Sequence, residues 1–363
     1  MLGAAAGGVP AGTSYDLVFV PGDGIGPEVI AAGRRVLEAT GRIFGFGLRW
    51  REVLIGGVAI DAYGVPMRDE DLEVCRAADA VYFGSIGDPR FDDPSAKVRP
   101  EQALLGLRKG LGLYANLRPV SVQPVLRASS PVREALLEGV DMLIVRELTG
   151  GLYFGKSERV GDSAYDTMLY SEAECDRLLE YAFGLAARRG GLVHSVDKAN
   201  VLESSRLWRA AALRAAARWP AVEVRHMLVD NCAMQLIREP RQFDVIATEN
   251  LFGDILSDEA AMLTGSIGML PSASVGAGGV SLYEPIHGSA PDIAGRGIVN
   301  PCATILSAAM MLDLSFGQTA AARAVEAAVE TALAGGARTA DIAAADEPTI
   351  TTDEMTDRVI AAL

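Results

Sequence analysis

Short apolar runs alternate with longer amphipathic runs along most of this chain, and no other sequence feature limits its fold so strongly. Residues 16–20, 80–83 and 141–145 have the length and composition of buried strands. Further buried strands are predicted at 192–196, 222–229 and 243–248. Helices are predicted at 27–41, 100–109, 171–189, 204–218, 251–264 and, with a break at Gly335 and Gly336, from 320 onward. This alternation is typical of an α/β fold, and 363 residues suggest about two domains.

Charge and composition narrow the class of partner. The chain has 47 acidic and 33 basic residues, so its net charge is −14. Such a field repels nucleic acid phosphates and anionic lipid headgroups, so we expect a small-molecule substrate, no nucleic acid and no membrane partner. Residues 1–14 lack the features of a signal or transit peptide and are expected to form a loose tail, and the longest apolar run, 303–312, is too short to span a bilayer. The expected location is the cytoplasm, with all four cysteines reduced.

A glycine-rich turn, PGDGIG at 21–26, joins the first predicted strand to the first predicted helix. It does not complete the dinucleotide fingerprint G-x-G-x-x-G, because the third glycine would fall on Pro27. The simpler interpretation is a tight turn in which glycines adopt positive φ.

Three arginines lie where they would suit an anion in an otherwise acidic protein. Arg108 shares one face of the predicted helix at 100–109 with Glu101, Leu104 and Leu105, which have helical spacing. Arg118 and Arg146 lie at the ends of predicted elements. A guanidinium binds a carboxylate through two parallel hydrogen bonds, so this set favours a carboxylate ligand with an apolar branch. Taken singly, each arginine is more simply explained by a structural ion pair.

Two aspartates indicate a metal site. Asp254 and Asp258 are four residues apart in a predicted helix, where like charges repel unless a cation joins them. An all-carboxylate set favours Mg²⁺ or Mn²⁺. Asp230, at the end of the predicted strand 222–229, is a plausible third ligand. The alternative is that Asp254 caps the helix and Asp258 is merely solvated.

Three further segments have open interpretations. Lys198 follows a predicted strand and is either a structural cation or, partly desolvated near a metal, a general base. Tyr153 is either a phenolic acid or an ordinary core tyrosine. The turn-rich segment 283–295 has small residues that let backbone amides approach phosphates, although His287 within it is equally consistent with a structural loop histidine.

Together these segments closely resemble the isocitrate/isopropylmalate dehydrogenase family, in order from about residue 16 to residue 314. The motifs that carry the resemblance are PGDGIGPE at 21–28, RELTGGLYFG at 146–155, DKANVL at 197–202, FGDILSD at 252–258 and the loop at 287–300. The resemblance implies a two-domain α/β fold with a mixed parallel and antiparallel sheet, which is not a Rossmann fold. Residues 1–113 with 265–363 would bind the cofactor, and the inserted segment 114–264 would hold the metal site and the dimer interface.

The resemblance also implies the reaction and its residues. The enzyme would be a homodimer with shared active sites that uses NAD and Mg²⁺ or Mn²⁺ to oxidise and decarboxylate its substrate. Substrate carboxylates would be held by Arg108, Arg118 and Arg146. The metal would be held by Asp254 and Asp258 with Asp230 of the partner subunit, which would also lie beside the substrate. Lys198 of the partner subunit would be the base and Tyr153 the acid.

NAD would be bound mainly by the loop that begins at His287. The expected contacts are Glu101, His287, Gly288, Ser289, Ala290, Pro291, Asp292, Ile293 and Asn300. Asp292 would accept hydrogen bonds from the ribose and repel the 2′-phosphate of NADP. A departure from the family is Asp88, which stands where a glycine is expected near the cofactor.

Within the family, the substrate follows from an expected apolar pocket formed by Leu104, Leu105 and Val201. Burying the third carboxylate of isocitrate against leucines would be costly, so 3-isopropylmalate is favoured, which places the reaction in leucine biosynthesis. One methylene in such a pocket is worth only about 1–3 kcal/mol, so another 3-substituted malate, malate, tartrate or homoisocitrate remains an alternative. A catalytically silent subunit would lack a base or a metal ligand, and this chain has both.

Overall fold

The computed structural model describes residues 12–93 and 96–363, which form two compact units. One unit is Leu113–Thr264, and the other joins the described residues up to Gly112 to Gly265–Leu363. A loose tail was expected at 1–14. Its residues 1–11 lie outside the described residues, and Ser14 is the first residue of the first strand. The functions expected of the two segments stay predictions.

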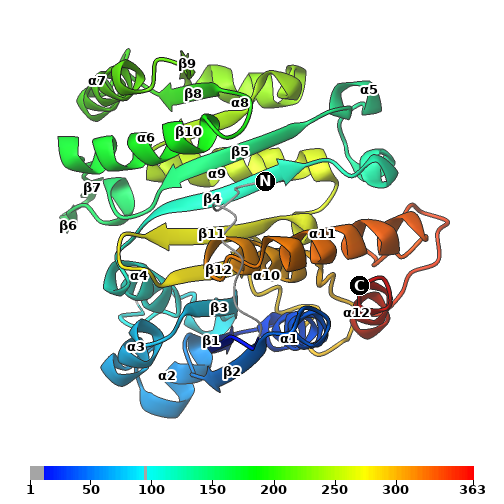
Figure 1. Cartoon of the computed structure of the whole chain (residues 1–363). Coiled ribbons are helices and arrows are strands. Elements are labelled where there is room, and N and C mark those ends of the chain that lie inside the picture. The colour runs from blue at the N-terminus through cyan, green and yellow to red at the C-terminus, as the bar shows by residue number, and fades with distance from the viewer. Residues whose placement is uncertain (1–11, 94–95) are drawn as a thin grey trace. The chain divides into compact units, whose positions relative to one another are not determined.

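The 113–264 unit has a five-stranded sheet in the order β4-β5-β10-β8-β9 (Figure 1). Its strands are β4 (Leu113–Ser121), β5 (Asp141–Glu147), β8 (Leu192–Asp197), β9 (Glu223–Leu228) and β10 (Val245–Thr248). Strand β4 is antiparallel to β5, and the other neighbours are parallel. A separate antiparallel hairpin is formed by β6 (Ser157–Val160) and β7 (Ser163–Asp166).

Helices cover both faces of this sheet. On one face α6 (Glu172–Ala186) packs against α7 (Glu203–Arg218), and on the other α8 (Val229–Arg238) packs against α9 (Asn250–Ala261) (Figure 1). Helix α6 begins with a capping box, in which Ser171 and Glu174 each satisfy the other's backbone amide. Shorter helices are α5 (Glu134–Leu137), η2 (Pro124–Ser129), η3 (Gly151–Tyr153), η4 (Pro240–Gln242) and η5 (Met262–Thr264).

The other unit also has five strands, in the order β2-β1-β3-β12-β11. They are β1 (Ser14–Gly22), β2 (Gly47–Glu52), β3 (Ala80–Ser85), β11 (Pro271–Gly276) and β12 (Ser281–Pro285). The pair β11–β12 is antiparallel, and the remaining pairs are parallel. The helices are α1 (Gly26–Phe44), α2 (Gly57–Tyr63), α3 (Asp69–Arg76), α4 (Glu101–Gly110), α10 (Cys302–Leu314), α11 (Thr319–Ala334) and α12 (Thr352–Ala361), with short η1 (Pro89–Phe91) and η6 (Ile267–Met269).

The glycine-rich turn after β1 is tight, as the sequence predicts. Gly22 and Gly24 have φ of 72° and 57°, a region that L residues rarely adopt. A Cβ on Gly22 would lie 1.9 Å from the carbonyl oxygen of Ser85, so this turn also needs glycine for space. Pro27 then occupies the first turn of α1, where its missing amide hydrogen costs nothing.

The predicted mixed α/β fold is confirmed, and the break in the C-terminal helical region separates α11 from α12. The prediction is wrong near Val229, because β9 ends at Leu228 and Val229 begins α8. It is also wrong in treating that strand as buried, because β9 is at the edge of its sheet and is partly exposed. The helix predicted at 251–264 ends at Ala261, and the last three residues form a 3₁₀ turn.

Both sheets have apolar cores in which the four cysteines are buried and unpaired, as expected. None of the helices in the described ranges is long and apolar enough to cross a bilayer.

Candidate active site

Two buried arginines extend from neighbouring antiparallel strands. Arg118 lies on β4 and Arg146 on β5, and their side chains are 6% and 2% exposed as residues. Asn116 of β4 lies opposite Arg146 of β5. Arg118 is two residues further along β4, so the two arginines are close to each other on this pair of strands. A buried arginine needs hydrogen-bond or ion-pair partners, so the role of these two arginines depends on the side chains around them.

Helix α9 supplies those partners. Its first turn is capped by Glu249, whose carboxylate accepts hydrogen bonds from the amides of Leu251 and Phe252. The interpretation of Asp254 as a helix cap is therefore wrong. Asp254 lies in the middle of α9, one turn before Asp258.

The aspartates meet the arginines on one face of α9. Arg146 Nη1 forms an ion pair with Asp254, and Arg118 Nη1 lies 3.4 Å from Asp258 Oδ1. Arg118 also donates to the Ser257 hydroxyl at 2.5 Å. Burial raises the pKa of Asp258, and the adjacent Arg118 opposes this rise. Two cations and two carboxylates thus lie together, and the anion and metal sites expected of them stay predictions.

Two residues of this cluster were not singled out from the sequence. Asn250 Oδ1 accepts hydrogen bonds from Arg146 Nε at 3.1 Å and from Nη2 at 2.8 Å, and Asn250 is buried. A Cβ on Gly253 would lie 2.6 Å from Arg146 Cγ, so only glycine lets the arginine pass so close to α9. The available signal was their position, Gly253 within the FGDILSD motif and Asn250 two residues before it, but their roles depend on where Arg146 lies.

Tyr153 joins the same cluster. Its hydroxyl donates to Asp254 Oδ2 at 2.5 Å, and the Arg146 guanidinium carbon lies 5.4 Å from the ring centre. Burial and the bond to Asp254 raise the pKa of Tyr153, so its hydroxyl stays protonated at neutral pH. At 37% exposure it is not a core tyrosine.

Lys198 and Asp230 form a second cluster within the same unit. Lys198 Nζ lies 2.8 Å from Asp230 Oδ1, and this bond lowers the pKa of Asp230. The Lys198 backbone amide donates to the Ser205 hydroxyl at 3.0 Å, which fixes the start of the loop. Val201, predicted to line a substrate pocket, is 62% exposed.

In the other unit, the four residues predicted to share one helix face all lie on α4. Arg108 is buried and its Nη2 donates to Glu284 Oε1 of β12 at 3.0 Å, so it does form the structural ion pair that was the alternative. Its Nε is buried without a hydrogen-bond partner among the described residues. Leu104 and Leu105 are half-buried, and Glu101 is exposed at the start of the helix.

The predicted cofactor loop follows β12 in this unit. Ser289 and Asn300 are buried, whereas Gly288, Pro291 and Asp292 are exposed. Ala290 has φ of 36°, a left-handed conformation that is uncommon outside glycine. The loop and α4 both lie close to Gly87. A Cβ on Gly87 would lie 3.3 Å from Ser289 Oγ of the loop and 3.5 Å from Glu101 Oε1 of α4.

His287 lies half-buried at the beginning of that loop. Its Nδ1 is 3.0 Å from the Gly288 carbonyl oxygen, and its Nε2 is buried without a partner among the described residues. Burial lowers the pKa of His287, so the ring is neutral at pH 7. A neutral ring with an unused nitrogen fits a ligand contact better than a fully satisfied loop histidine.

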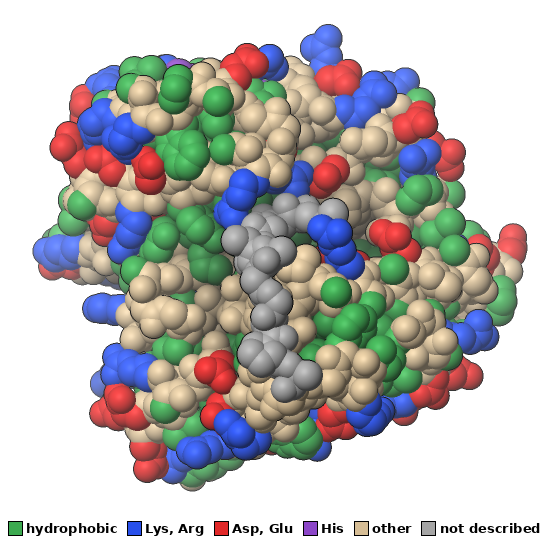
Figure 2. All heavy atoms as spheres, in the orientation of Figure 1, with side chains coloured by type: hydrophobic (Ala, Val, Ile, Leu, Met, Phe, Trp, Pro, Cys, Tyr) green, Lys and Arg blue, Asp and Glu red, His purple; other side chains and the backbone are tan. Residues whose placement is uncertain are grey.

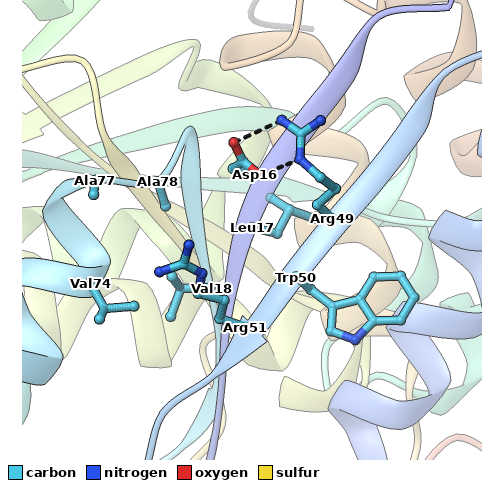
Figure 3. A pocket seen from close by; sticks show the side chains of 9 residues that line it. All are labelled: Asp16, Leu17, Val18, Arg49, Trp50, Arg51, Val74, Ala77 and Ala78. Carbon is cyan, nitrogen blue, oxygen red and sulfur yellow. Dashed lines mark hydrogen bonds and ion pairs between the residues drawn. The ribbon is translucent and has the colours of Figure 1, made fainter.

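A pocket of about 310 Å³ lies elsewhere in this unit, between β2 and α3 (Figure 3). Asp16 accepts two hydrogen bonds from Arg49 at its rim, and Val18, Val74 and Ala78 are among its apolar lining residues. None of the predicted site residues lines it.

Comparisons with known proteins show to which family the chain belongs. A family model for isocitrate/isopropylmalate dehydrogenase matches residues 16–359. A 3-isopropylmalate dehydrogenase of Halalkalibacterium halodurans is 54% identical over 352 residues, covering 96% of this chain and 97% of that protein. Another, of Shouchella clausii, is 55% identical over 352 residues with the same coverage of 96% and 97%. The chain belongs to the isocitrate/isopropylmalate dehydrogenase family.

Solved structures confirm the isocitrate/isopropylmalate dehydrogenase fold. An isocitrate dehydrogenase from Methylococcus capsulatus superimposes with a TM-score of 0.86 at 34% identity, covering 96% of this chain and 99% of that one. A β-decarboxylating dehydrogenase from Thermococcus kodakarensis gives 0.78 at 40% identity, covering 96% of each. The family consists of NAD-linked, metal-dependent decarboxylating dehydrogenases, so the chain is an enzyme of that class.

Membership of the isocitrate/isopropylmalate dehydrogenase family implies a divalent cation. The described residues of one subunit offer two suitable carboxylate ligands for it. Asp254 and Asp258 offer carboxylate oxygens from successive turns, the ligand type that Mg²⁺ and Mn²⁺ prefer. Among the described residues of one subunit, however, no three His, Cys, Asp or Glu side chains gather to hold a metal. The expectation that Asp230 of the partner subunit is the third ligand stays a prediction.

Asp88, the departure from the isocitrate/isopropylmalate dehydrogenase pattern, has a local role. Its side chain accepts from the amide and guanidinium of Arg90, and Arg90 also pairs with Asp61 at 2.8 Å. The carboxylate is thus held by an arginine close to it in sequence.

Proposed function

We propose that this enzyme is a 3-isopropylmalate dehydrogenase. It would convert (2R,3S)-3-isopropylmalate and NAD⁺ to 4-methyl-2-oxopentanoate, CO₂ and NADH in leucine biosynthesis. The observation that carries the proposal is the cluster in which buried Arg118 and Arg146 meet Asp254 and Asp258 with the Tyr153 hydroxyl. The relatives that carry this name are more than half identical along nearly the whole chain, which supports it.

The arginines and the acid have clear roles in this reaction. Arg118 and Arg146 would hold the substrate carboxylates, because their guanidinium groups are buried and already aligned by Asn116 and Asn250. Tyr153, whose raised pKa keeps it protonated, would donate a proton to C3 after CO₂ leaves. Arg108 of α4 would also bind a substrate carboxylate.

Lys198 would remove the proton of the C2 hydroxyl. It would accept this proton as the neutral amine. Its side chain lies beside Asp230 and is about a quarter exposed, so it is accessible to a substrate bound to a second copy of the chain. When bound, NAD⁺ would supply the hydride acceptor and the divalent cation would supply a Lewis acid for the C2 oxygen. Asp254 and Asp258, with Asp230 of the partner subunit, would hold that cation, and Asp230 would also lie beside the substrate.

The NAD site would be formed by the loop from His287 to Asn300 with Glu101. The exposed Asp292 and the small residues Gly288, Ser289 and Ala290 suit a ribose and a diphosphate, respectively. The unit with this loop would be the cofactor domain, and 113–264 the metal and dimerisation domain.

Specificity for the isopropyl group would come from half-buried Leu104 and Leu105 on α4, together with Val201. An aliphatic surface of this kind binds a branched alkyl group and disfavours a third carboxylate.

The proposed assembly is a homodimer with shared active sites. Helices α8 and α9 expose large apolar side chains, with Met234, Ile237 and Ile255 at 62%, 40% and 58% exposure. The β6–β7 hairpin adds Val160 and Tyr165 at 58% and 43%. A second copy covering these side chains would remove apolar surface from water and bring Lys198 to the neighbouring site.

Nucleic acids and membranes are not among the proposed partners, and the proposed location is the cytoplasm. On the face drawn in Figure 2, basic side chains alternate with acidic ones and form no broad basic area. A net charge of −14 adds a repulsive field for polyanions.

The test is NADH formation at 340 nm with Mg²⁺ or Mn²⁺, comparing 3-isopropylmalate with isocitrate, malate, tartrate and homoisocitrate. We expect rapid turnover of 3-isopropylmalate alone, loss of activity with EDTA and recovery with added metal. Preference for another acid would retain the reaction class and reject the leucine pocket. Inactivity on all five by a folded dimer would reject the proposal in favour of a silent subunit.

A further inference from the structure

The carboxylate of Glu28 binds two backbone amides of the loop that we assign to NAD. Its Oε1 accepts from Gly295 N, and its Oε2 accepts from Gly297 N at 3.1 Å. Glu28 lies in the first turn of α1, far in sequence from that loop. Both glycines have positive φ, 74° and 65°, so the backbone turns sharply where Glu28 holds it.

Apolar contacts join the same two segments. Ile25 and Val29 of the turn and first part of α1 pack with Val299, and Ala290, Ile293 and Ala294 of the loop pack against them. The amide of Ile25 also donates to the Ser289 carbonyl oxygen at 2.8 Å. A Cβ on Gly24 would lie 2.0 Å from that oxygen, so the approach is as close as glycine permits.

This loop has little regular structure to order it. Residues 286–299 contain turns and bends but no helix or strand, and several are exposed. Ordering such a segment when a ligand binds costs conformational entropy, so contacts that order it beforehand strengthen binding. The start of α1 is the surface on which the loop is ordered.

We propose that Glu28 is a positioning residue for the cofactor, which sets the affinity for NAD by holding the loop at Gly295 and Gly297. The inference rests on the proposed function, since the loop's role in NAD binding belongs to that proposal. A carboxylate suits this role because each oxygen accepts one amide hydrogen at the same time. A glutamine offers one oxygen, and its NH₂ group would face the second amide hydrogen.

The experiment compares Glu28→Gln with wild type and with Glu38→Gln in the full-length enzyme. Glu38 lies on the same helix and binds Arg34 at the surface at 2.9 Å, so it is a matched control for the loss of one charge. NADH binding is measured by titrating its fluorescence, and hydrogen–deuterium exchange is measured in peptides covering 286–299.

For Glu28→Gln we expect the Kd for NADH and the KM for NAD⁺ to rise about tenfold, the loss of one hydrogen bond to a charged group. The KM for 3-isopropylmalate and kcat should stay within about twofold, because Arg118, Arg146 and Lys198 belong to the other unit and Arg108 is bound by Glu284. Exchange should accelerate in the 286–299 peptides, and Glu38→Gln should match wild type in every measurement.

An unchanged Kd for NADH in Glu28→Gln would overturn the inference, even if exchange accelerates, because the bond would then be structural only. If Glu28→Gln does not fold by circular dichroism, Glu28→Asp keeps the negative charge and withdraws the carboxylate by one methylene. It should also raise the Kd, and a wild-type value would equally overturn the inference. If the wild-type protein binds no NADH, the proposed function and this inference are rejected together. A Kd for NADH that is higher in Glu28→Gln than in the wild type supports both.

Discussion

Lys198 Nζ lies 2.8 Å from Asp230 Oδ1, so the proposed base and a proposed metal ligand form an ion pair within one subunit. Asp230 is in the first turn of α8, and Lys198 follows β8. The pair lies in the same unit as Asp254 and Asp258, yet Asp230 does not join them in a three-ligand cluster. In the proposed homodimer, Lys198 and Asp230 would act together on the active site of the second copy.

Replacing Lys198 with methionine should abolish turnover and leave the fold intact. A general base contributes about 10²–10⁴-fold to a rate, so kcat should fall by at least about 100-fold. Steady-state kinetics and circular dichroism measure the two effects. Lys109→Met, an exposed lysine at the end of α4, is the control and should remain active. A Lys198→Met enzyme with near wild-type kcat would contradict the assignment of the base.

Shared active sites make a sharper prediction for mixed dimers. Lys198→Met and Asp258→Asn should each be inactive alone. When the two are unfolded, mixed and refolded, a mixed dimer has one site with both changes and one site with neither. About a quarter of wild-type activity should return, because half the dimers are mixed and each has one intact site of two. Absence of any recovery in verified mixed dimers would mean that each active site takes both residues from one subunit, which would contradict the shared-site proposal.

Asn250 should influence substrate binding through Arg146. Its side-chain oxygen accepts two hydrogen bonds from that guanidinium, and its NH₂ group donates to the Gly150 carbonyl at 3.1 Å. For Asn250→Ala we expect the KM for 3-isopropylmalate to rise about tenfold, because a released arginine loses its alignment. The KM for NAD⁺ should change less than about twofold. An equal rise in both KM values would indicate a general loss of structure instead.

Asp292→Lys should shift the cofactor preference toward NADP. The aspartate is exposed on the loop, where its charge would repel a 2′-phosphate and a lysine would attract one. We expect the ratio of kcat/KM for NADP⁺ to that for NAD⁺ to rise at least about tenfold, a difference of about 1.4 kcal/mol. Asp346→Lys makes the same charge change at another exposed position and should leave the ratio unaltered. An unchanged ratio in Asp292→Lys would remove this residue from the cofactor site.

His194 should make the protein less stable in acid. It is buried on β8 against Phe243, neither ring nitrogen has a partner among the described residues, and burial lowers its pKa to about 4. The unfolded ring takes up its proton near pH 6.5, so between these values the unfolded state binds more protons than the folded state. The free energy of unfolding therefore falls as the pH falls from 6.5 to about 4, by up to about 3 kcal/mol from this group.

Urea unfolding at several pH values tests this dependence. His194→Leu removes the titrating ring from the core, so its free energy of unfolding should decline less steeply than that of wild type below pH 6.5. Parallel declines for the two proteins would show that His194 contributes nothing to the acid sensitivity.

The hydrophobic pattern predicted most of the elements that position the site, because burial leaves a period in the sequence wherever an element packs on a core. Strand β5 and helix α9 were expected close to their observed ends. Strands β2, β4, β11 and β12 were not predicted, so Arg118 lies inside a strand that the pattern missed. For β2 the reason is that five of its six residues are exposed, so it lacks an apolar run. The start of α8 was misplaced, because the apolar residues of β9 continue through Val229 without a break.

The sequence alone determined the mixed α/β class, the family and the residue types required for oxidation and decarboxylation, because each depends on local patterns and contiguous motifs. Only the tertiary structure decided which partners these side chains have. Asn250 was revealed as the partner of Arg146, Glu284 as that of Arg108, and Glu28 as the anchor of the loop at Gly295 and Gly297. Hydrogen bonds between residues distant in sequence leave no local pattern, since a buried polar group shows its partner only once the chain has folded around it.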